Sequence, residues 1–573
     1  MRICLTKLIV LMALISLTAC TTFHTTPPML VSHDGVTLQK TYYHAETIAS
    51  DGTRIRMTVY QPALKKGETA PLLIHAHGYE MGRMARPFST YGKLLIPGKV
   101  SLRAWDEGYW VISYDLRGMG DSQGQVSLMA ADKEPKDVSA VIDWALKNLS
   151  ISQKNDHPMI GMIGESYGGA VQMSVTTQDP RIVALVPMTT WYNLQEALFP
   201  QGVPKTDWLM FLGVVGYTMG PVHMDHHAAI SSFKEIFGTS NPQFLNELYQ
   251  NSLAAHCQGT EEPHADALLI QGVRDVLFPL NQALDARACF QRAGRDVRLI
   301  AVEHGHLQPT AQLSPGLPIW YTQDRVRCEG QVYELADIIN DWLNGKLRDD
   351  QAALDRVPRY CVTGDPKIDA NPPQLTWFPL QKVTSHSGLT GEFEWLAKPL
   401  EGAKNLFTPN CQPQSAPENA PEGTLPSCVS EDWDHPSNGW LRPARIPIYA
   451  ATVPTWIVGV PHVQLTIPEA NSKKAVFFLR LAAWTPHSGS YRVLSQQVTP
   501  VRAHGRLDLE LNAVRDKLMP GEVLGLLVQG HSDQFHFSDS HMTTSVSVSG
   551  QIGLPLAPAN DATPYDWRVA KQK

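Results

Sequence analysis

Short apolar runs alternate with amphipathic segments along residues 70–302, and this alternation is the feature that most limits the possible folds. Residues 138–149 carry apolar side chains at the spacing of one helix face. Strands that alternate with helices form a mostly parallel sheet with helices on both faces. The sequence therefore predicts an α/β domain. Its strands are expected at Leu72–Ala76, Trp110–Tyr114, Met159–Ile163, Ile182–Val186, Ala267–Ile270 and Val297–Val302.

An insert rich in Trp, Leu, Met and Phe interrupts this pattern at residues 191–262. Because it lies between two expected strands, we predict a helical cap above the C-terminal edge of the sheet. Phe233–Phe237 and Phe244–Leu253 are two of its helix-like stretches. The α/β domain is then expected to comprise residues 30–190 and 263–345.

We expect the α/β domain to end with a helix at Val332–Leu343, closed by a C-cap at Gly345. Residues 346–370 are charged and read as a connection. From 371 to 573, short alternating segments are divided by Gly, Pro and Asn turns, which predicts an all-β sandwich. Its strands are expected at Thr452–Val460, Val463–Thr466, Val476–Ala482, Tyr491–Gln497, Leu507–Leu511, Val523–Gln529 and Thr544–Ile552.

A nucleophile is predicted at Ser166, in the segment Gly164-Glu165-Ser166-Tyr167-Gly168. The segment fits G-x-S-x-G, follows the buried run Met159–Ile163 and precedes a helix-like stretch. This is the context of a nucleophile elbow, in which the serine occupies a strained strand-to-helix turn. Glycines two positions before and after the serine let the strand and helix approach closely enough for that turn.

The rest of a catalytic triad is expected in the order Ser, acid, His. Asp275 follows the run Ala267–Ile270 in a turn, and Asp285 on the next helix-like segment is the less favoured substitute. The last expected strand runs into Glu303-His304-Gly305-His306. We favour His306 as the general base, with His304 as the alternative. The oxyanion hole needs two donors, for which we expect the backbone N–H of Tyr167 and the N–H or phenol of Tyr79.

The N-terminus reads as a targeting segment. Residues 1–20 have a positive start, an apolar run of about ten residues and the ending Leu17-Thr18-Ala19-Cys20. This ending resembles a bacterial lipobox, so we expect Cys20 to be lipidated and the protein to be exported. It would be anchored by lipid in the cell envelope, at the outer membrane, facing the periplasm or the surface. Of the remaining cysteines, Cys411 and Cys428 flank one Pro-rich loop and are the pair expected to form a disulfide.

Net charge and residue spacing exclude other classes. The formal net charge of −7 offers no general attraction for nucleic acid. His75, His77 and other histidines lack the spacing of a metal site, so we expect no metal and no organic cofactor.

The segment Gly108–Gly124, which contains Asp115-Leu116-Arg117-Gly118-Met119-Gly120-Asp121-Ser122, resembles the D-x-R-G-x-G-x-S-x-G motif of the Xaa-Pro dipeptidyl-peptidase and cocaine-esterase (CocE/NonD) hydrolases. The resemblance covers roughly residues 35–345. It implies an α/β-hydrolase fold, a triad of Ser166, Asp275 and one of the two histidines, and Tyr79 as the oxyanion tyrosine. It also implies that the β-rich tail is similar to that family's C-terminal jelly-roll domain.

We therefore expect a serine hydrolase that cleaves a small-molecule ester or peptide through an acyl-enzyme. A dipeptidyl-peptidase would also need an anion for the substrate amine, for which Glu80, Glu165 and Glu303 are candidates. Trp191 and Phe199 are candidate pocket residues in the cap. Two alternatives stay open: a polyester or lipid acyl hydrolase, and a catalytically silent surface-binding lipoprotein that uses its β-sandwich.

Overall fold

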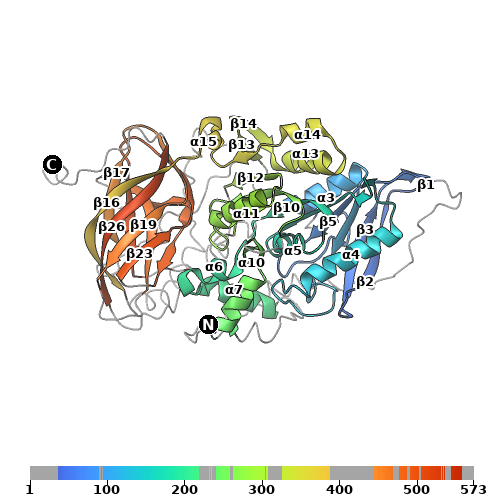
Figure 1. Ribbon diagram of the computed structural model, residues 1–573, viewed down its shortest axis with the longest axis horizontal. Coiled ribbons are helices and arrows are strands. Elements are labelled where there is room, and N and C mark those ends of the chain that lie inside the picture. The colour runs from blue at the N-terminus through green and yellow to red at the C-terminus, as the bar shows by residue number, and fades with distance from the viewer. Residues whose placement is uncertain are drawn as a thin grey trace, which may run out of the picture.

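The computed structural model describes most of the chain between Thr37 and Ala557. An α/β part with a helical insert is followed by a part made of β-strands (Figure 1). The predicted targeting segment, Cys20, His304, Cys411 and Cys428 lie outside the described residues. The description leaves out residues 1–36, 219–230, 235–240, 258–261, 307–324, 388–442, 469–475, 487–490, 536–543 and 558–573, and positions 90, 91, 93, 233, 304, 503, 504, 531 and 533.

A nine-stranded sheet with the order β15-β12-β11-β10-β9-β5-β6-β3-β2 forms the centre of the α/β part. All six strands predicted from the apolar runs lie in its parallel region, because their side chains are buried on both faces of the sheet. β2 and β3 add an antiparallel hairpin at one edge. The bounds are β2 Thr41–Ile48, β3 Arg54–Gln61, β5 Leu72–Ala76, β6 Trp110–Tyr114, β9 Ile160–Glu165, β10 Ile182–Met188, β11 Asp266–Gly272, β12 Val297–Val302 and β15 Tyr360–Cys361.

Helices cover both faces of this sheet. α3 (Ile96–Asp106) and α13 (Leu335–Leu347) share one apolar core with alternate strand residues such as Leu73. On the opposite face, the neighbouring Leu72 belongs to the core that contains α4, α5 and α11. This is the period-two burial expected of central strands. The bounds of these three helices are α4 Glu134–Asn148, α5 Tyr167–Val175 and α11 Leu280–Arg292.

The direction of strand progression reverses between β5 and β9. β6 follows β5 in the chain and lies on one side of it, whereas the chain then crosses back to place β9 on the other side. The loops after β5 and β9 therefore diverge at the carboxyl edge of the sheet. A reversal of this kind opens the crevice in which α/β proteins bind ligands.

Two expectations for the end of the α/β part are wrong. A further strand, β15, pairs with β12, so the sheet extends beyond residue 345 and β12 is not its last strand. Gly345 lies inside α13 rather than at its C-cap. An added Cβ at this position would lie only 2.7 Å from the Leu354 side chain. This glycine therefore serves the close approach of α13 to α14 (Gln351–Arg356).

Within the described residues, the cap insert contributes several helices and a 3-10 turn next to the sheet edge (Figure 1). The predicted stretch Phe244–Leu253 corresponds to α9 and the start of α10, whereas most of Phe233–Phe237 lies outside the described residues. The elements are α6 Leu194–Leu198, the 3-10 turn Pro200–Gly202, α7 Thr206–Thr218, α9 Pro242–Gln250 and α10 Leu253–His256. Small elements elsewhere are β1 Thr37–Leu38, β4 Leu64–Lys65, β7 Gln153–Lys154, β8 His157–Pro158, β13 Arg325–Cys328, β14 Gln331–Glu334 and α15 Pro366–Ala370.

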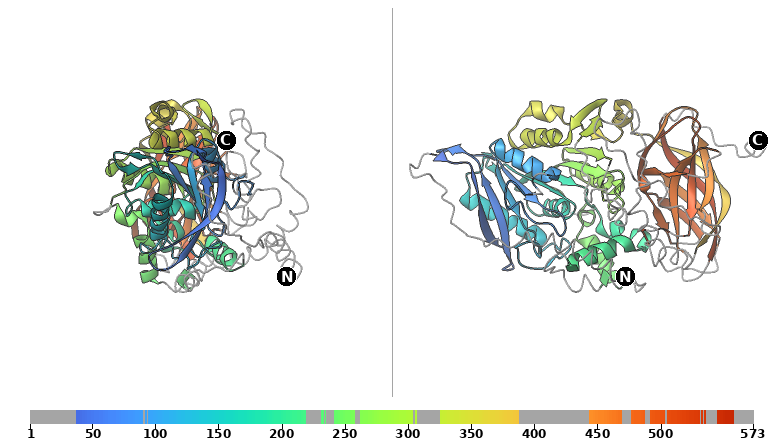
Figure 2. Two further views of the ribbon diagram at one scale, coloured as in Figure 1. Left: turned by 90° about the vertical axis from the view of Figure 1, so that its right-hand side faces the viewer. Right: turned by 180° about the vertical axis from the view of Figure 1, so that it is seen from behind.

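The C-terminal part consists of two sheets that share one apolar core (Figures 1 and 2). The first has the order β23-β19-β26-β18-β24, with β16 paired to β26. The second has the order β17-β25-β20-β21, with β22 paired to β20. Every described pairing within them is antiparallel. The bounds are β16 Leu375–Ser387, β17 Ala444–Ala450, β18 Thr455–Gly459, β19 His462–Ile467, β20 Phe477–Trp484, β21 Arg492–Val493, β22 Thr499–Val501, β23 Gly505–Glu510, β24 Val514–Leu518, β25 Val523–Gln529 and β26 Thr544–Ala557.

Most of the predicted strands are present in this sandwich, but Tyr491–Gln497 is not one strand. β21 covers only two of its residues and is followed by the 3-10 turn Leu494–Gln496, in which Ser495 and Gln496 have φ values of 50° and 57°. β16, β17, β22 and β24 were not predicted. Each of these strands carries a proline or several charges, which weakens the alternating signal.

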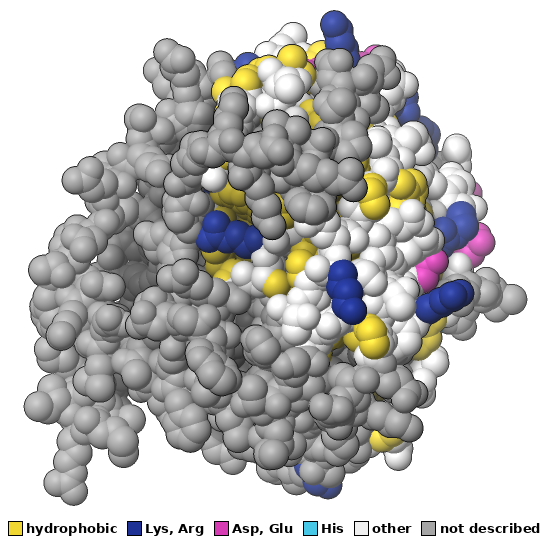
Figure 3. All heavy atoms as spheres, turned by 90° about the vertical axis from the view of Figure 1, so that its left-hand side faces the viewer, with side chains coloured by type: hydrophobic (Ala, Val, Ile, Leu, Met, Phe, Trp, Pro, Cys, Tyr) yellow, Lys and Arg dark blue, Asp and Glu magenta, His cyan; other side chains and the backbone are white. Residues whose placement is uncertain are grey.

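The sandwich stands at one end of the molecule, beside the cap and the strand ends of the α/β part (Figure 2). Asn281 at the start of α11 joins the two parts through bonds to the backbone of Leu511 and Ala513, at 3.1 and 2.6 Å. Val203 of the cap packs in a small apolar cluster with Phe478 of β20. On the side of the sandwich that faces away from the α/β part, hydrophobic side chains lie at several places among Lys and Arg (Figure 3).

Two disulfides tie segments of the α/β part together. Cys257, just after α10, is bonded to Cys289 of α11, and Cys328 of β13 is bonded to Cys361 of β15. Four of the six cysteines that remain after the targeting segment are thus paired. Among the described residues, no helix combines the length and apolar character needed to cross a bilayer.

Candidate active site

Ser166 occupies a tight turn between β9 and α5. Its φ of 53° and ψ of −117° lie outside the regions that residues other than glycine usually adopt. A Cβ at Gly164 or Gly168 would lie 2.3 or 2.2 Å from the carbonyl oxygen of Ala76 in β5. Glycine at both positions therefore lets β5, β9 and α5 converge around the serine. The G-x-S-x-G segment has the strand–turn–helix geometry of a nucleophile elbow.

His306 lies between Ser166 and Asp275. Its Nε2 is 3.1 Å from Ser166 Oγ, and its Nδ1 is 2.8 Å from Asp275 Oδ2. Since a carboxylate accepts at Nδ1, the neutral ring carries its proton there and presents Nε2 as an acceptor to the serine hydroxyl. The imidazole is hydrogen-bonded to Asp275 and not to Asp285, which lies on α11.

Asp275 is fully buried in the turn that follows β11. Its Oδ1 accepts hydrogen bonds from the backbone N–H groups of Leu277 and Phe278 at 3.0 and 2.7 Å. The approach of the histidine loop depends on Gly305, because a Cβ there would lie 2.5 Å from Asp275 Cβ and 2.8 Å from Oδ2. The glycine before His306 is thus a requirement for contact between the two loops.

Two donors are expected for an oxyanion hole, the backbone N–H of Tyr167 and a group of Tyr79. Tyr167 is the first residue of α5, so its backbone N–H has no acceptor within the helix. Its phenol donates to Glu134 Oε1 at 2.9 Å and is engaged there. The rings of Tyr79 and Tyr167 lie 5.9 Å apart. Burial, and then the neighbouring Glu80, raises the pKa of the Tyr79 phenol, so it remains a donor at neutral pH.

Aromatic side chains surround the imidazole. Phe278 and Trp208 contact the His306 ring edge-on, with ring centroids 5.0 and 5.7 Å away. Trp191 bridges Phe278 and Tyr167 at 5.1 and 5.8 Å. These walls are buried and exclude water, which strengthens electrostatic interactions at the serine.

The two predicted pocket residues of the cap have different surroundings. Trp191 belongs to this aromatic wall, whereas Phe199 packs on Phe244 within the cap at 6.4 Å. Trp208, which the structure brings against His306, was predicted only as part of the insert at residues 191–262. Nothing in its spacing marks it for the site.

The three candidate carboxylates for an amine have different environments. Glu303 is paired with Arg274 at 2.8 Å and with Arg515 of the sandwich. Glu165 ends β9 and lies beside Gly78. Glu80 follows Tyr79 with a φ of 57°, and burial raises the pKa of its carboxyl to about 7. Glu80 is therefore the candidate that combines partial burial with a position next to Tyr79 in the chain.

Buried ion pairs support the loop after β6. Asp115 accepts from the backbone N–H of Arg83 at 2.7 Å and of Asp121 at 2.9 Å, and it also pairs with the Arg83 guanidinium. Arg117 binds both oxygens of Asp137 at 2.6 Å. The D-x-R-G motif thus has a structural role here. Arg83 was missed by the sequence reading, because its spacing from Asp115 carries no signal.

The histidines near the site are packed rather than arranged for a metal. His75 Nδ1 lies 2.8 Å from Ser113 Oγ, and burial lowers the pKa of His75 to about 3. His77 bonds to the carbonyl of Gly78 and accepts from the N–H of Leu116. The described residues contain no group of three or more His, Cys, Asp or Glu side chains placed to hold a metal ion.

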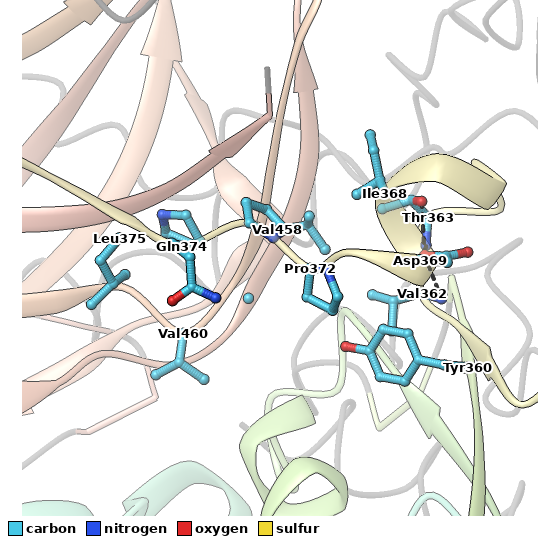
Figure 4. A pocket seen from close by; sticks show the side chains of 13 residues that line it. Tyr360, Val362, Thr363, Ile368, Asp369, Pro372, Gln374, Leu375, Val458 and Val460 are labelled. Atoms are coloured by element: carbon cyan, nitrogen blue, oxygen red, sulfur yellow. Dashed lines mark hydrogen bonds between the residues drawn. The ribbon is translucent and has the colours of Figure 1, made fainter. Parts of the chain in front are cut away.

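A cavity of about 170 Å³ lies at the junction of the α/β part and the sandwich (Figure 4), and its lining includes none of Ser166, Asp275 and His306. Tyr360, Val362, Val458 and Val460 line it together with several prolines. Its buried carboxylate, Asp369, already accepts from Thr363 and neighbouring backbone N–H groups. The cavity therefore belongs to the interface between the α/β part and the sandwich.

Comparisons with known proteins show which family this region of the chain resembles. Residues 51–308 match the X-Pro dipeptidyl-peptidase (S15) family. This matched region contains Ser166, Asp275 and His306. The expected family resemblance is confirmed for this part of the chain.

Curated relatives match over short stretches. An uncharacterized 31.7 kDa protein of Escherichia coli is 32% identical over 117 residues, 20% of this chain and 36% of the relative. A cutinase of Thermobifida alba is 26% identical over 176 residues, 29% of this chain and 52% of the relative. The chain thus spans between about a third and a half of the length of these relatives.

Solved structures match over nearly the whole chain. An aminopeptidase from a Thaumarchaeota archaeon aligns with a TM-score of 0.60 at 13% identity, covering 94% of this chain and 98% of that one. A CocE/NonD family hydrolase from Staphylococcus aureus aligns with a TM-score of 0.55 at 12% identity, covering 93% and 100%. An α-amino acid ester hydrolase has a TM-score of 0.53 at 14% identity, covering 93% and 100%. The fold is therefore that of a CocE/NonD-type α/β hydrolase with an attached β-sandwich.

Proposed function

We propose that this protein is a serine hydrolase in which Ser166 attacks the carbonyl carbon of an ester or amide. The observation that carries the proposal is the hydrogen-bonded series from Ser166 Oγ through His306 to Asp275. His306 Nε2 removes the serine proton as the C–O bond forms, and Asp275 stabilises the resulting imidazolium. The imidazolium then gives its proton to the leaving alcohol or amine, which leaves an acyl-enzyme.

The negative charge on the carbonyl oxygen would be stabilised by the Tyr167 backbone N–H and the Tyr79 hydroxyl. Donors that the fold already directs at this oxygen need not reorganise as the charge develops. Water, activated by His306 in the same way, then hydrolyses the acyl-enzyme. None of these steps needs a group other than the residues named and water.

For the substrate, we propose an acyl group that carries a free amine, as in an amino-acid ester or a short peptide. Glu80 is the supporting observation, because its half-buried carboxyl lies next to the oxyanion tyrosine. The S15 family name and two of the solved relatives, an aminopeptidase and an α-amino acid ester hydrolase, favour the same class.

A second candidate is an ester with an apolar acyl chain. It is favoured by the aromatic wall around His306 and by the sequence similarity to a cutinase. The two candidates differ in what they require of Glu80. The substitution Glu80→Gln should raise KM for an alanyl-prolyl anilide or an amino-acid ester about tenfold or more. It should leave KM for an aryl butyrate unchanged.

The first experiment is covalent labelling of the signal-less protein with a fluorophosphonate probe. Wild type should label, whereas Ser166→Ala should not and Asp275→Asn should label far more slowly. A panel of alanyl-prolyl anilide, amino-acid esters and simple acyl esters then identifies the class. A folded wild type that stays unlabelled would refute the proposal and leave the silent binding lipoprotein as the remaining hypothesis.

We further propose that the protein is exported and anchored to the bacterial envelope by lipid on Cys20. The two disulfides support an oxidising compartment. Metabolic labelling with a radioactive fatty acid should label the wild type and not Cys20→Ala. In cell fractionation, wild type should be found with the membrane and the variant in the soluble periplasm. A wild type without the fatty-acid label would contradict the proposal.

A further inference from the structure

The turn that carries Asp275 is held by side chains from two other regions of the chain. Gln497 of the sandwich donates from Nε2 to the carbonyl oxygens of Val273 and Asp275, at 3.3 and 3.0 Å. Lys205 of the cap donates from Nζ to the carbonyl oxygens of Val276 and Leu277, both at 2.8 Å. These four carbonyls belong to the turn between β11 and α11.

Three consecutive peptide units of this turn are hydrogen-bonded through both their carbonyl and their N–H groups. In the unit after Asp275, the carbonyl binds Gln497 and the N–H of Val276 donates to the carbonyl of His306 at 3.0 Å. In the next two units, the carbonyls bind Lys205 and the N–H groups donate to Asp275 Oδ1. Rotation of any of these peptide planes would break a bond to the triad together with a bond to the outside side chain.

The orientation of the Gln497 amide is set within the sandwich. Its Oε1 accepts from Asn512 Nδ2 at 3.2 Å, so Nε2 is directed at the turn. The preceding Ser495 exchanges hydrogen bonds of 3.0 Å with the backbone of Arg515 and thereby anchors the tight 3-10 turn. Arg515 in turn pairs with Glu303, three residues before His306. The sandwich therefore contacts both loops that supply the triad.

Lys205 lies just before α7 and is fully buried. Burial lowers the pKa of its amine to about 7, and even a neutral amine has the two N–H groups that these two carbonyls need. A buried lysine carries a large desolvation cost, which an apolar residue of the same length would avoid. Its two bonds to the acid turn are the contacts that distinguish it from such a residue.

We propose that Gln497 and Lys205 are positioning residues, which keep Asp275 aligned with His306 and so make hydrolysis depend on the sandwich and the cap. This inference rests on the proposed serine hydrolase function. It predicts that loss of either donor slows attack by Ser166 while substrate binding is retained, because neither side chain forms part of the oxyanion hole or the aromatic wall.

The test uses Gln497→Met and Lys205→Met, which keep side-chain length and remove the donors. The full-length variants are assayed for the rate of fluorophosphonate labelling and for kcat and KM with the ester that wild type cleaves fastest. We expect labelling and kcat to fall about 10- to 100-fold with KM changed less than about twofold. Gln529→Met is the matched control, since Gln529 is 5% exposed and Gln497 4%, and both belong to the sandwich.

Asn512→Asp provides a milder variant if either methionine variant does not fold. A carboxylate in place of the Asn512 amide favours rotation of the Gln497 amide, which would turn its oxygen toward the turn carbonyls. The same fall in kcat is expected. Folded variants with wild-type labelling and kcat would overturn the inference and leave the proposed function intact, whereas an unlabelled wild type would remove both.

Discussion

The contact between Gly305 and Asp275 leads to a sharp prediction for Gly305→Ala. The added methyl carbon would lie 2.5 Å from Asp275 Cβ and 2.8 Å from Oδ2. Carbon atoms pack at about 3.5–4 Å, so the two loops must separate by about 1 Å. The 2.8 Å bond between His306 and Asp275 would then be lost. A hydrogen bond to a charged group contributes about 1.5–3 kcal/mol, which corresponds to about 10- to 150-fold in rate.

The assay is the second-order rate of fluorophosphonate labelling, measured on protein whose fold is checked by circular dichroism. Labelling of Gly305→Ala should be about 100-fold slower than that of wild type. Gly82→Ala is the control, because its Cβ would meet only Asp115 Oδ1, at an ordinary 3.6 Å. A folded Gly305→Ala that labels within about threefold of wild type would show that the loops tolerate the separation and that the reasoning is wrong.

Three further predictions concern stability and chemistry. Between about pH 7 and its ordinary pKa of 10.5, Lys205 binds a proton in the unfolded chain and not in the folded one. The free energy of unfolding should therefore rise by up to about 1.4 kcal/mol per pH unit in that range. Denaturant titrations should show this rise in wild type and not in Lys205→Met, and equal slopes would contradict the assignment. Replacing Cys257 and Cys289 by Ser removes a cross-link between positions 32 apart. We expect a loss of about 3–4 kcal/mol, seen as a lower thermal midpoint, and an unchanged midpoint would oppose it. Tyr79→Phe should lower kcat about 10²- to 10³-fold with little change in KM, and an unchanged kcat would exclude the phenol from the oxyanion hole.

Local patterns in the sequence determined most of the α/β part. The strands Leu72–Ala76 and Val297–Val302 were predicted with the bounds that the structure has, because a central parallel strand must be apolar on both faces. The elbow around Ser166 was equally visible, since only glycine fits two positions before and after it. These are properties of a short segment and its immediate neighbours, which a sequence displays directly.

Weaker local signals produced the errors. The alternating stretch Tyr491–Gln497 reads as a strand, but Leu494–Gln496 form a 3-10 turn that directs the following Gln497 toward the α/β part. Gly345 reads as a C-cap, but it is the point where α13 meets α14. In each case a contact with another segment of the chain overrode the local preference of the backbone.

The support of the turn that carries Asp275 is the part that only the tertiary structure decided. The sequence supplied Ser166, Asp275 and the histidine pair in the right order, but not the Lys205 and Gln497 bonds that hold the acid turn. Gln497 lies 222 residues from the Asp275 carbonyl that it binds. No periodicity or motif reports a bond between side chain and backbone over such a separation, because its partner is any carbonyl that the fold brings near. Chemistry within a turn is encoded locally, whereas the alignment of that turn depends on how the sandwich and the cap pack against it.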